Sequence, residues 1–314
     1  MEQFDLVAVG SATVDLFFKI ETSNPHFKFN EETNELSMKL GEKVVLDRAE
    51  LLTGGNANNV SIGVKRLGFK TALVAEIGDD EFAHKILSNL EKEGVDATHV
   101  LKGNSETSFS VILNYKDDRT IFTRKPEREH NFNLSDVSTK WIYLTSLGNK
   151  WENAYRKVFE LVSENALNLA FNPGEIQIEK GLGGISYILR KTDILILNKE
   201  EAVTILNSKL QIANSKDEIK NILFELKNFG PKIVVITDGG NGSYAVDQER
   251  KVHFEKAEDV EVVSKTGAGD AYSTGFLGAT LSSLSVKDAM RWGSKNAASV
   301  LSKIGAQTGL LSSI

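Results

Sequence analysis

The sequence contains no cysteine among its 314 residues. This absence excludes disulfides, a thiolate nucleophile and a zinc site with cysteine ligands, and it fits a reducing compartment. Histidine is also scarce, with five residues at widely separated positions. Neither a histidine metal site nor a Ser-His-Asp triad is therefore indicated.

Long hydrophobic runs are missing as well. Apolar runs such as Ile194–Leu197 and Ile233–Ile236 are far too short to span a bilayer, and the first ten residues, MEQFDLVAVG, carry acids where a signal peptide needs cations. The 37 basic residues are outnumbered by 43 acidic ones and form no stripe that would neutralise a phosphate backbone. We expect a cytoplasmic protein that binds neither membranes nor nucleic acid.

Several common catalytic motifs do not occur: the GxxxxGK(S/T) phosphate loop, the GxGxxG dinucleotide fingerprint, the HExxH zinc motif and the GxSxG nucleophile elbow. A dinucleotide-dependent oxidoreductase is therefore disfavoured. The remaining composition, with 41% hydrophobic and 25% charged residues, is that of an ordinary globular protein.

Short apolar runs alternate with longer amphipathic stretches along most of the chain. Strands are predicted at Leu6–Val9, Ala72–Ile77, Trp141–Leu144, Leu167–Phe171, Ile194–Leu197 and Ile233–Thr237, and helices at Glu81–Glu93, Glu152–Glu164 and Asp217–Lys227. This order predicts an α/β fold with a mostly parallel central sheet covered by helices on both faces.

Two segments interrupt the alternation, at about residues 16–52 and 108–123. Each has short strand-like runs separated by polar turns, the second around Lys116, Asp117 and Asp118. Such segments cannot form βα units, and we expect them to build a small antiparallel sheet that acts as a lid over a cleft. Edges exposed by strands at Leu16–Ile20 and Leu36–Leu46 predict that two lids pair in a homodimer.

The strongest local signal is the glycine-rich turn Thr266-Gly267-Ala268-Gly269-Asp270, which precedes a sequence with helical apolar spacing. Backbone N–H groups and the dipole at such a helix N-terminus bind an anion, and glycines let a phosphate approach closely. Asp270 would lie beside that anion as a base for an attacking hydroxyl. A helix capped by Thr266, with Asp270 favourable to its dipole, accounts for the same spacing.

A second glycine motif, GGNANN at Gly54–Asn59, leads into another sequence with helical spacing. Glycines permit close backbone approach, and asparagine amides offer donors and acceptors that suit ligand hydroxyls. Asp15, just after the first strand, is placed to bind a diol. A glycine turn with an asparagine cap and a turn aspartate are the structural alternatives.

Two further motifs follow strands. Asn198 and Glu201 come after Ile194–Leu197 and fit a capping box, so a role toward magnesium or phosphate needs other support. TDGGNG at Thr237–Gly242 joins two strand-like runs, and the pattern is typical of a hairpin turn or of a loop beneath a nucleotide.

In their order along the chain, these motifs resemble those of the ribokinase-like, or pfkB-type, family of carbohydrate kinases: Asp15, GGNANN, IGDD at 77–80, Asn198 with Glu201, TDGGNG and TGAGD. The resemblance covers about Val9–Ala306. It implies one kinase domain over residues 1–314, with a three-layer α/β/α sandwich and a β lid. It also implies that the γ-phosphoryl group of ATP, with Mg²⁺, is transferred to a hydroxymethyl group of a sugar or sugar derivative.

The resemblance implies a role for each matching position. Asp270 resembles the catalytic base, and the amides of Gly267, Ala268 and Gly269 resemble the anion hole. The positions implied to contact the acceptor are Asp15, Gly55, Asn56 and Asn59; those implied to bind the nucleotide are Asn198, Thr237, Asp238, Gly239, Gly242 and Asn296; and Glu201 is implied to hold magnesium through water.

The chain departs from the family pattern at three places. Ser264, beside Lys265, stands where much of the family has an Asp that helps to hold a monovalent cation, so potassium activation stays open. Thr13 replaces an Asn that ribokinases tend to have. Thr145 and Ser146 follow a strand where a carboxylate near ribose is expected. These departures weaken ribose as the acceptor.

Two alternatives remain open. A nucleoside kinase of the same family would sandwich a base between aromatic residues of the lid, although aromatics in a small sheet are more often core. The aromatic residues in question are Phe17, Phe18, Phe27 and Phe29. A non-catalytic binding or regulatory member would have no chemical need for Asp270, so the intact motif favours an enzyme.

Overall fold

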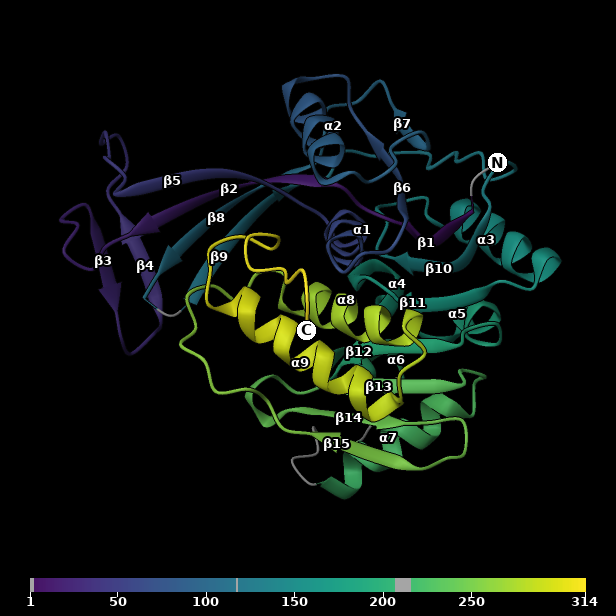
Figure 1. The fold of residues 1–314 in the computed structure, drawn as a ribbon. Coiled ribbons are helices and arrows are strands. Elements are labelled where there is room, and N and C mark those ends of the chain that lie inside the picture. The colour runs from purple at the N-terminus through teal and green to yellow at the C-terminus, as the bar shows by residue number, and fades with distance from the viewer. Residues whose placement is uncertain (1–2, 117, 207–215) are drawn as a thin grey trace.

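The computed structural model describes residues 3–116, 118–206 and 216–314, so Asp117, expected in a turn of the lid, lies outside the described residues. The main sheet consists of β1 (Phe4–Val9), β6 (Thr71–Ile77), β7 (Val100–Lys102), β10 (Thr139–Thr145), β11 (Asn168–Asn172), β12 (Ile194–Asn198), β13 (Ile233–Thr237), β14 (Ser243–Val246) and β15 (Val252–Glu255). Its strand order is β15-β14-β13-β12-β11-β10-β1-β6-β7 (Figure 1). All pairs from β7 to β13 are parallel, and β14 and β15 add antiparallel strands at one edge. The six predicted strands and the mostly parallel sheet are confirmed.

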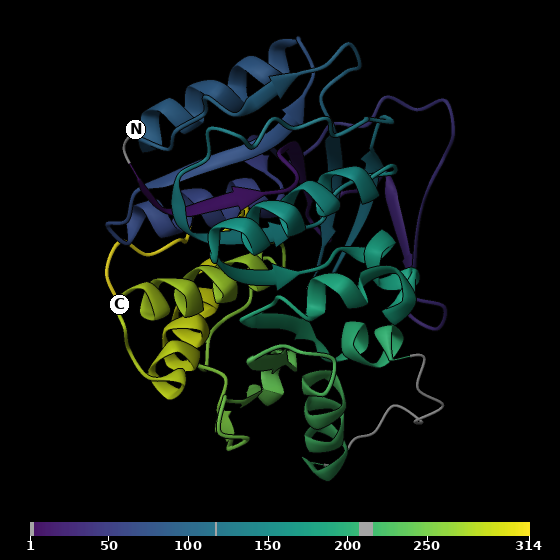
Figure 2. The same ribbon diagram turned by 90° about the vertical axis from the view of Figure 1, so that its right-hand side faces the viewer.

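Helices cover both faces of this sheet. They are α1 (Asn56–Arg66), α2 (Glu81–Glu93), α3 (Glu152–Asn165), α4 (Glu175–Glu179), α5 (Gly181–Leu189), α6 (Lys199–Ile205), α7 (Lys216–Lys227), α8 (Ala268–Leu281) and α9 (Val286–Leu301). Side chains of a strand alternate between faces. Leu6 and Ala8 of β1 accordingly pack with α1, α2, α8 and α9, whereas Val7 and Val9 pack with α3 to α7. The result is the expected three-layer α/β/α sandwich (Figure 2).

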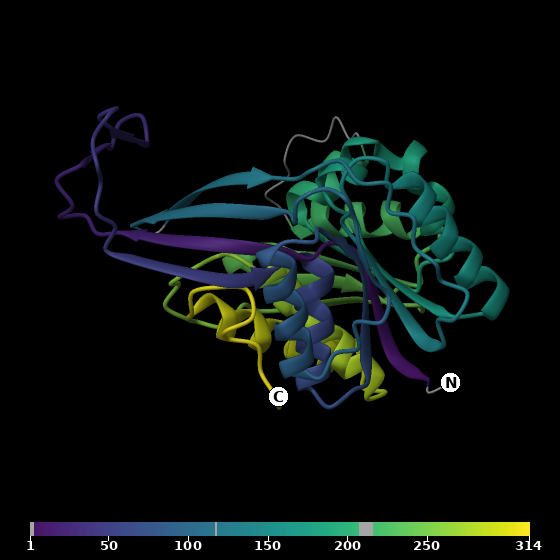
Figure 3. The same ribbon diagram turned by 90° about the horizontal axis from the view of Figure 1, so that it is seen from above.

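The lid is a second sheet that projects from this sandwich (Figure 3). It contains β2 (Thr13–Ile20), β5 (Arg48–Gly54), β8 (Phe109–Tyr115) and β9 (Asp118–Arg124) in the order β5-β2-β8-β9, with a separate hairpin of β3 (Phe27–Asn30) and β4 (Glu35–Met38). The pairs β2–β5 and β8–β9 are antiparallel, as expected. The pair β2–β8 is parallel, because the chain crosses over through α1, β6 and α2 before it enters β8.

The prediction that Leu16–Ile20 and Leu36–Leu46 form the exposed edge strands of the lid is wrong. Both sides of β2 are paired, so the open edges of the lid sheet belong to β5 and β9. Of the stretch expected as a strand at Leu36–Leu46, only the part up to Met38 is a strand, in β4. Lys19 of β2 pairs with Arg48, and β2 ends one residue later, so residues 39–46 run past the end of β2 and have no strand to pair with.

The parallel strands place their carboxyl ends at one edge of the main sheet, which faces the lid. The residues that follow β1, β10, β12 and β13, and the start of α8, all lie along this edge. Ligands of open α/β sheets bind at such an edge. No helix in the described ranges is long and apolar enough to cross a membrane.

Close packing of α8 against its neighbours fixes where the start of α8 lies. A Cβ added at Gly275 of α8 would lie 2.3 Å from the carbonyl oxygen of Trp292 in α9, and one at Gly63 of α1 would lie 2.5 Å from Thr274 in α8. Only glycine permits these approaches, since other residues would displace backbone or a buried threonine.

We expect Gly275→Ala to lower the free energy of unfolding by about 1–3 kcal/mol, because the added methyl collides with backbone of α9. This loss would exceed the gain of up to about 1 kcal/mol that alanine brings to a helix. Gly183 of α5 is the matched control, since a Cβ there meets nothing within 4 Å. Gly183→Ala should stabilise slightly. Urea denaturation followed by circular dichroism measures both; equal stability of Gly275→Ala and the wild type would contradict the packing.

Candidate active site

Two cavities meet at the start of α8. The first, called here the lid cavity, has a volume of about 490 Å³ and is lined by residues of β2 and β8 and by Asn56, Asn59, Gly267 and Asp270. The second, called here the glycine cavity, has a volume of about 720 Å³ and is lined in part by Gly239, Gly240, Gly242, Ala268 and Gly269. Successive residues of one glycine-rich turn therefore face different cavities.

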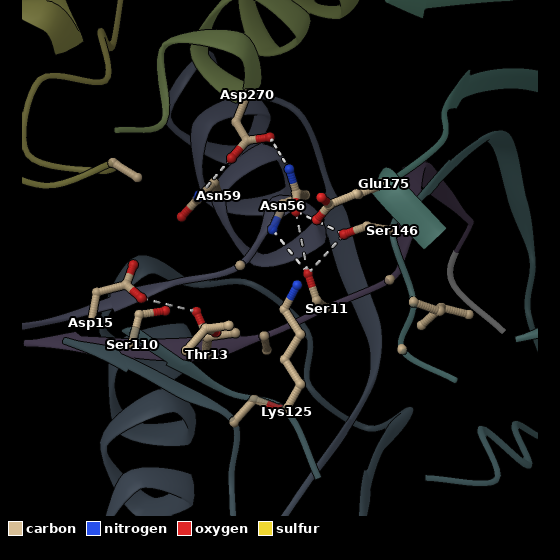
Figure 4. A pocket seen from close by; sticks show the side chains of 18 of the residues that line it. Ser11, Thr13, Asp15, Asn56, Asn59, Ser110, Lys125, Ser146, Glu175 and Asp270 are labelled. Carbon is tan, nitrogen blue, oxygen red and sulfur yellow. Dashed lines mark hydrogen bonds between the residues drawn. The ribbon is translucent and has the colours of Figure 1, made fainter. Parts of the chain in front are cut away.

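Asp270 lies at the junction, and its carboxylate is held by two asparagine amides (Figure 4). Asn56 Nδ2 donates to Asp270 Oδ1 at 2.9 Å, and Asn59 Nδ2 donates to Oδ2 at 2.7 Å. Only 7% of Asp270 is exposed. Burial raises the pKa of this carboxyl, whereas the two amide donors act in the opposite direction.

The orientation of both asparagine amides is fixed by hydrogen bonds to their side-chain oxygens. Gln307 Nε2 donates to Asn59 Oδ1 at 2.8 Å, while Ser146 Oγ donates to Asn56 Oδ1 at 2.8 Å. Gln307 is itself held, because Thr53 Oγ1 donates to its Oε1 at 2.8 Å. Each asparagine must therefore turn its NH₂ group toward Asp270. The carboxylate receives hydrogen bonds from both sides and keeps lone pairs for a proton from a third group.

The N-terminus of α8 has no side-chain cap. Gly267 is the N-cap residue with a φ of +82°, and a Cβ there would lie 2.3 Å from Ala306 Cβ, so glycine is required. Thr266 does not cap the helix, because its Oγ1 is buried without a hydrogen-bond partner in the described part of the chain. A Cβ at Gly269 would meet nothing within 4 Å, so the turn leaves room for a ligand beside its backbone.

Asp15 lines the lid cavity from β2. The hydroxyl of Thr13 donates to Asp15 Oδ1 at 3.4 Å. Burial, with a smaller contribution from the charge of Asp270, raises the pKa of Asp15 to about 6, although hydrogen bonds from Ser110 and Thr13 act in the opposite direction. Gly55, with a φ of +94°, brings the start of α1 against the turn after β1. All four residues expected to contact the acceptor thus line one cavity with Asp270.

The expected nucleotide-binding residues separate into two groups. Thr237, Gly239 and Gly242 line the glycine cavity, in the loop between β13 and β14 that closes the predicted hairpin. Asp238 and Asn296 do not line it. Asp238 lies 3.6 Å from Lys199 Nζ. Asn296 is fully buried, where it donates to the Ala271 carbonyl at 2.7 Å and accepts from the Leu311 N–H.

Asn198 and Glu201 form the capping box that their spacing suggested. Asn198 Oδ1 accepts from the Glu201 N–H, and Glu201 Oε2 accepts from the Asn198 N–H, both at 2.8 Å. Burial raises the pKa of Glu201, and the charge of Asp270 contributes in the same direction. Neither residue lines the two cavities.

A carboxylate that the sequence did not indicate lies beside Ser146. Glu175, the first residue of α4, lines the lid cavity next to Ser146 and Asn56 (Figure 4). The sequence analysis expected a carboxylate directly after β10, which ends at Thr145. Glu175 belongs to α4 instead, so the residues after β10 did not indicate it. Ser264, which stands where the resemblance implies an Asp, is buried, and its Oγ accepts from the Thr266 N–H at 3.3 Å.

Other lining residues were also missed by the sequence analysis. They are Ser11, Ser110, Lys125, Arg128 and His130. Ser11 follows the end of β1, and Ser110 is the second residue of β8, so both lie close to strand boundaries that the sequence indicates. Lys125, Arg128 and His130 lie in an irregular segment after β9, where the sequence has no periodicity that indicates a direction.

The lid phenylalanines do not form a stacking site. None of Phe17, Phe18, Phe27 and Phe29 is among the described residues that line the lid cavity, and no Phe, Tyr or Trp is. Phe29 instead packs against Tyr115, with ring centroids 5.3 Å apart, and Phe17 is buried. The structural role that aromatics usually have in a small sheet therefore applies here.

Comparison with known proteins identifies relatives over nearly the whole chain. The chain is 27% identical over 263 residues to an uncharacterized sugar kinase of Archaeoglobus fulgidus, covering 81% of this chain and 100% of that protein. It is 24% identical to a 5-dehydro-2-deoxygluconokinase of Clostridium perfringens, covering 94% and 86%. The structure of Arabidopsis thaliana ribokinase complexed with ribose and ATP matches with a TM-score of 0.78 at 20% identity, covering 99% and 95%.

The ribokinase-like fold that the resemblance implied is confirmed by this structural match. A family model described as "pfkB family carbohydrate kinase" matches residues 7–313. The chain therefore belongs to the pfkB family of carbohydrate kinases.

Proposed function

We propose that residues 1–314 form one kinase domain that transfers the γ-phosphoryl group of ATP to a hydroxymethyl group of a sugar or sugar derivative. One observation carries this proposal: the turn Gly267–Asp270 separates two cavities, with Asp270 in one and Gly269 in the other. The acceptor occupies the lid cavity and the nucleotide occupies the glycine cavity. Phosphoryl transfer needs this arrangement, since the two oxygens must lie in line on opposite sides of phosphorus.

Asp270 is the base in this reaction. It accepts the proton of the acceptor hydroxyl as that oxygen bonds to the γ-phosphorus, and ADP leaves on the other side. The backbone N–H groups of Gly267, Ala268 and Gly269 donate to the oxygens of the transferring group, where negative charge lies. Because Asn56 and Asn59 already hold the carboxylate in place, no side-chain rearrangement is needed when the acceptor arrives.

The glycine cavity fits a nucleotide. A Cβ would meet nothing within 4 Å at Gly239, Gly240 or Gly269, so open space lies beside the backbone at three lining positions. The cavity also offers apolar contacts and Tyr272, whose hydroxyl donates to Ser243 Oγ at 2.9 Å. Thr237, Gly239 and Gly242 are the expected residues that we retain for this site, and Asn296 and Asp238 support it from outside the lining.

Magnesium would be held mainly by phosphate oxygens and water. Among the described residues, no group of three or more His, Asp or Glu side chains forms a ready metal site. Mg²⁺ commonly binds through one or two carboxylates together with phosphates and several waters, and Glu201, in the first turn of α6 after β12, supplies such a carboxylate. The ion would neutralise charge on the β- and γ-phosphates. Asn198 holds Glu201 in position through the capping box.

The lid cavity suits a sugar better than a nucleoside. Its polar lining offers carboxylates, hydroxyls and amides for several hydroxyl groups, whereas it has no aromatic ring on which a base would stack. The 5-dehydro-2-deoxygluconokinase relatives act, by their name, on a sugar derivative that is not a nucleoside. Release of ADP from ATP and magnesium, measured over pentoses, hexoses, keto-deoxy sugar acids and nucleosides, tests the proposal.

We expect Asp270→Asn to lose turnover by about 100-fold or more, because it removes the proton acceptor, while ATP binding is retained. The matched control is Asp288→Asn. Asp288 occupies the same position in α9, three residues after the N-cap residue, but lies away from both cavities. The control should turn over like the wild type. Equal effects of the two variants would mean that Asp270 acts only on the helix dipole.

The pKa of Asp15 predicts how acceptor binding depends on pH. Its pKa of about 6 means that the carboxylate gains a proton as the pH falls through about 6 and then loses an acceptor for ligand hydroxyls. The KM for the acceptor should therefore rise below about pH 6, approaching about tenfold per pH unit, while the KM for ATP stays constant. Steady-state kinetics between pH 5 and 8 measures this. A KM that is flat in the wild type, or that rises equally in Asp15→Asn, would contradict the assignment.

We also propose that two copies pair through their lids. The edge strand β9 is open, and Phe122 on it is 56% exposed. Leu40 and Val45, in the segment of the lid between β4 and β5, are 92% and 71% exposed. Solution scattering should give the mass of a dimer at micromolar concentration. Phe122→Glu should shift it to a monomer, whereas Phe254→Glu, on the edge strand β15 at the far end of the main sheet, should not. A monomeric wild type would overturn the proposal.

A further inference from the structure

The lid cavity contains a cluster of basic side chains that the proposed hydroxyl chemistry does not use. Lys125, Arg128 and His130 line it from the segment after β9. Arg128 is 5% exposed and His130 is 4% exposed. Two cationic side chains, Lys125 and Arg128, repel a cation, so a ligand that contacts both is expected to carry negative charge.

Arg128 is buried with part of its hydrogen-bonding capacity unused. Its Nη2 donates to the carbonyl oxygen of Glu106. Its Nε and Nη1 are buried and have no hydrogen-bond partner in the described residues, and Nη1 lies 3.8 Å from Glu76 Oε1, too far for a hydrogen bond. Buried donors of native proteins are satisfied almost everywhere, and an unmet charged donor is costly, so these atoms need a partner in the cavity.

His130 presents the same pattern without a charge. Both of its ring nitrogens are buried and lack hydrogen-bond partners in the described part of the chain. Burial and the neighbouring charge of Arg128 lower the pKa of His130 to about 4, so the ring is neutral near pH 7 and offers one donor and one acceptor. Its backbone N–H donates to Glu76 Oε2 at 2.9 Å, which occupies that carboxylate oxygen.

Lys125 adds a second positive charge. It is exposed and extends its side chain from the end of β9 into the cavity (Figure 4). Within the described ranges it forms no ion pair with an acidic residue. Four carboxyls line the same cavity: Asp15, Glu76, Glu175 and Asp270. Asp15 and Asp270 are assigned to hydroxyls, and Glu175 lies beside Ser146 and Asn56 (Figure 4). Glu76 lies 3.8 Å from Arg128 Nη1, and the charges of Asp80 and Glu106, which do not line the cavity, also act on Arg128.

We propose that the acceptor carries an anionic group, a carboxylate or a phosphate, which Arg128 binds together with Lys125 and His130. This inference rests on the proposed kinase function and names the class of its substrate. An anion completes the hydrogen bonds of Arg128 and balances the charge of Lys125, which a neutral hydroxyl does not. The acceptor is thus a sugar acid or a sugar phosphate whose free hydroxymethyl group reaches Asp270.

The test measures ADP release with matched pairs of acceptors: 2-keto-3-deoxygluconate and fructose 6-phosphate as anionic probes, against fructose and ribose as neutral ones. We expect kcat/KM for one anionic probe to exceed that for the neutral sugars by about 100-fold, since buried donors left unpaired reject the wrong ligand. The arm that responds identifies carboxylate or phosphate. Faster turnover of neutral sugars than of both anionic probes would overturn the inference and leave the kinase function standing.

Variants separate recognition from a structural role. Arg128→Met should raise the KM for the anionic acceptor by about 10-fold or more without changing the KM for ATP, and Arg128→Lys should recover part of the loss. Arg124→Met is the control, because Arg124 is exposed, pairs with Glu106 at 2.6 Å and does not line the cavity. Equal losses of Arg128→Met toward anionic and neutral acceptors would mean that Arg128 only supports the fold.

A second variant covers the case in which Arg128→Met does not fold. Lys125→Met removes an exposed side chain and should weaken the anionic acceptor selectively, most strongly at low salt. If none of the acceptors is turned over, calorimetric titration measures the binding of the same two anionic probes instead. Binding that is lost in Lys125→Met supports the inference, and absence of binding to the wild type overturns it. Failure of the kinase function itself would show instead as ATP that is never hydrolysed or transferred and an Asp270→Asn variant that behaves like the wild type.

Discussion

The structure depends on how a buried carboxylate is kept in place at the end of a sheet. Asp270 is 7% exposed, and burial disfavours its ionised form. Two amides, from Asn56 and Asn59, compensate by donating to both of its oxygens. The two asparagines are three residues apart on α1, so they lie on one face of that helix and reach one carboxylate together.

This constraint determines much of the surrounding architecture. The helices α1 and α8 must approach closely for the amides to reach Asp270, and Gly63 against Thr274 permits that approach. Gln307, in the segment after α9, then fixes the orientation of Asn59. With α8 held at this point, its first turn separates the lid cavity from the glycine cavity. Positioning by these contacts supplies most of what phosphoryl transfer requires of a protein.

Much of the fold was predictable because local sequence signals agreed with the tertiary structure. The helix Glu81–Glu93 matched at both ends, where Asp80 caps its start and Gly94 ends it in the left-handed conformation. The lid strands were predicted less well. The β-rich residues before Arg48 suggested a strand, but a strand requires a partner, and β2 ends where those residues begin. The parallel β2–β8 pair likewise depends on a crossover that local pattern does not show.

The residues of the candidate site likewise fall into those that the sequence indicated and those that it did not. The glycine turn, Asn56 and Asn59 were found from motifs, since their chemistry is encoded in short spacings. Glu175, Gln307 and Arg128 were not, because each lies in a separate segment whose place at the cavity is set by packing alone. The lid cavity, to which we assign the acceptor, is lined in part by such residues, Glu175 and Arg128 among them. Motifs therefore identify the reaction more readily than the substrate.

The most direct test of the account is a crystal structure of the protein with a non-hydrolysable ATP analogue and magnesium. We predict that the phosphates extend from the glycine cavity to the start of α8, with γ-phosphate oxygens about 2.7–3.1 Å from the backbone nitrogens of the turn Gly267–Gly269. Asp270 should keep its two amide contacts and face an acceptor position in the lid cavity. Phosphates bound away from α8, or a carboxylate of Asp270 turned out of the lid cavity, would contradict the central claim that this turn is where the two substrates meet.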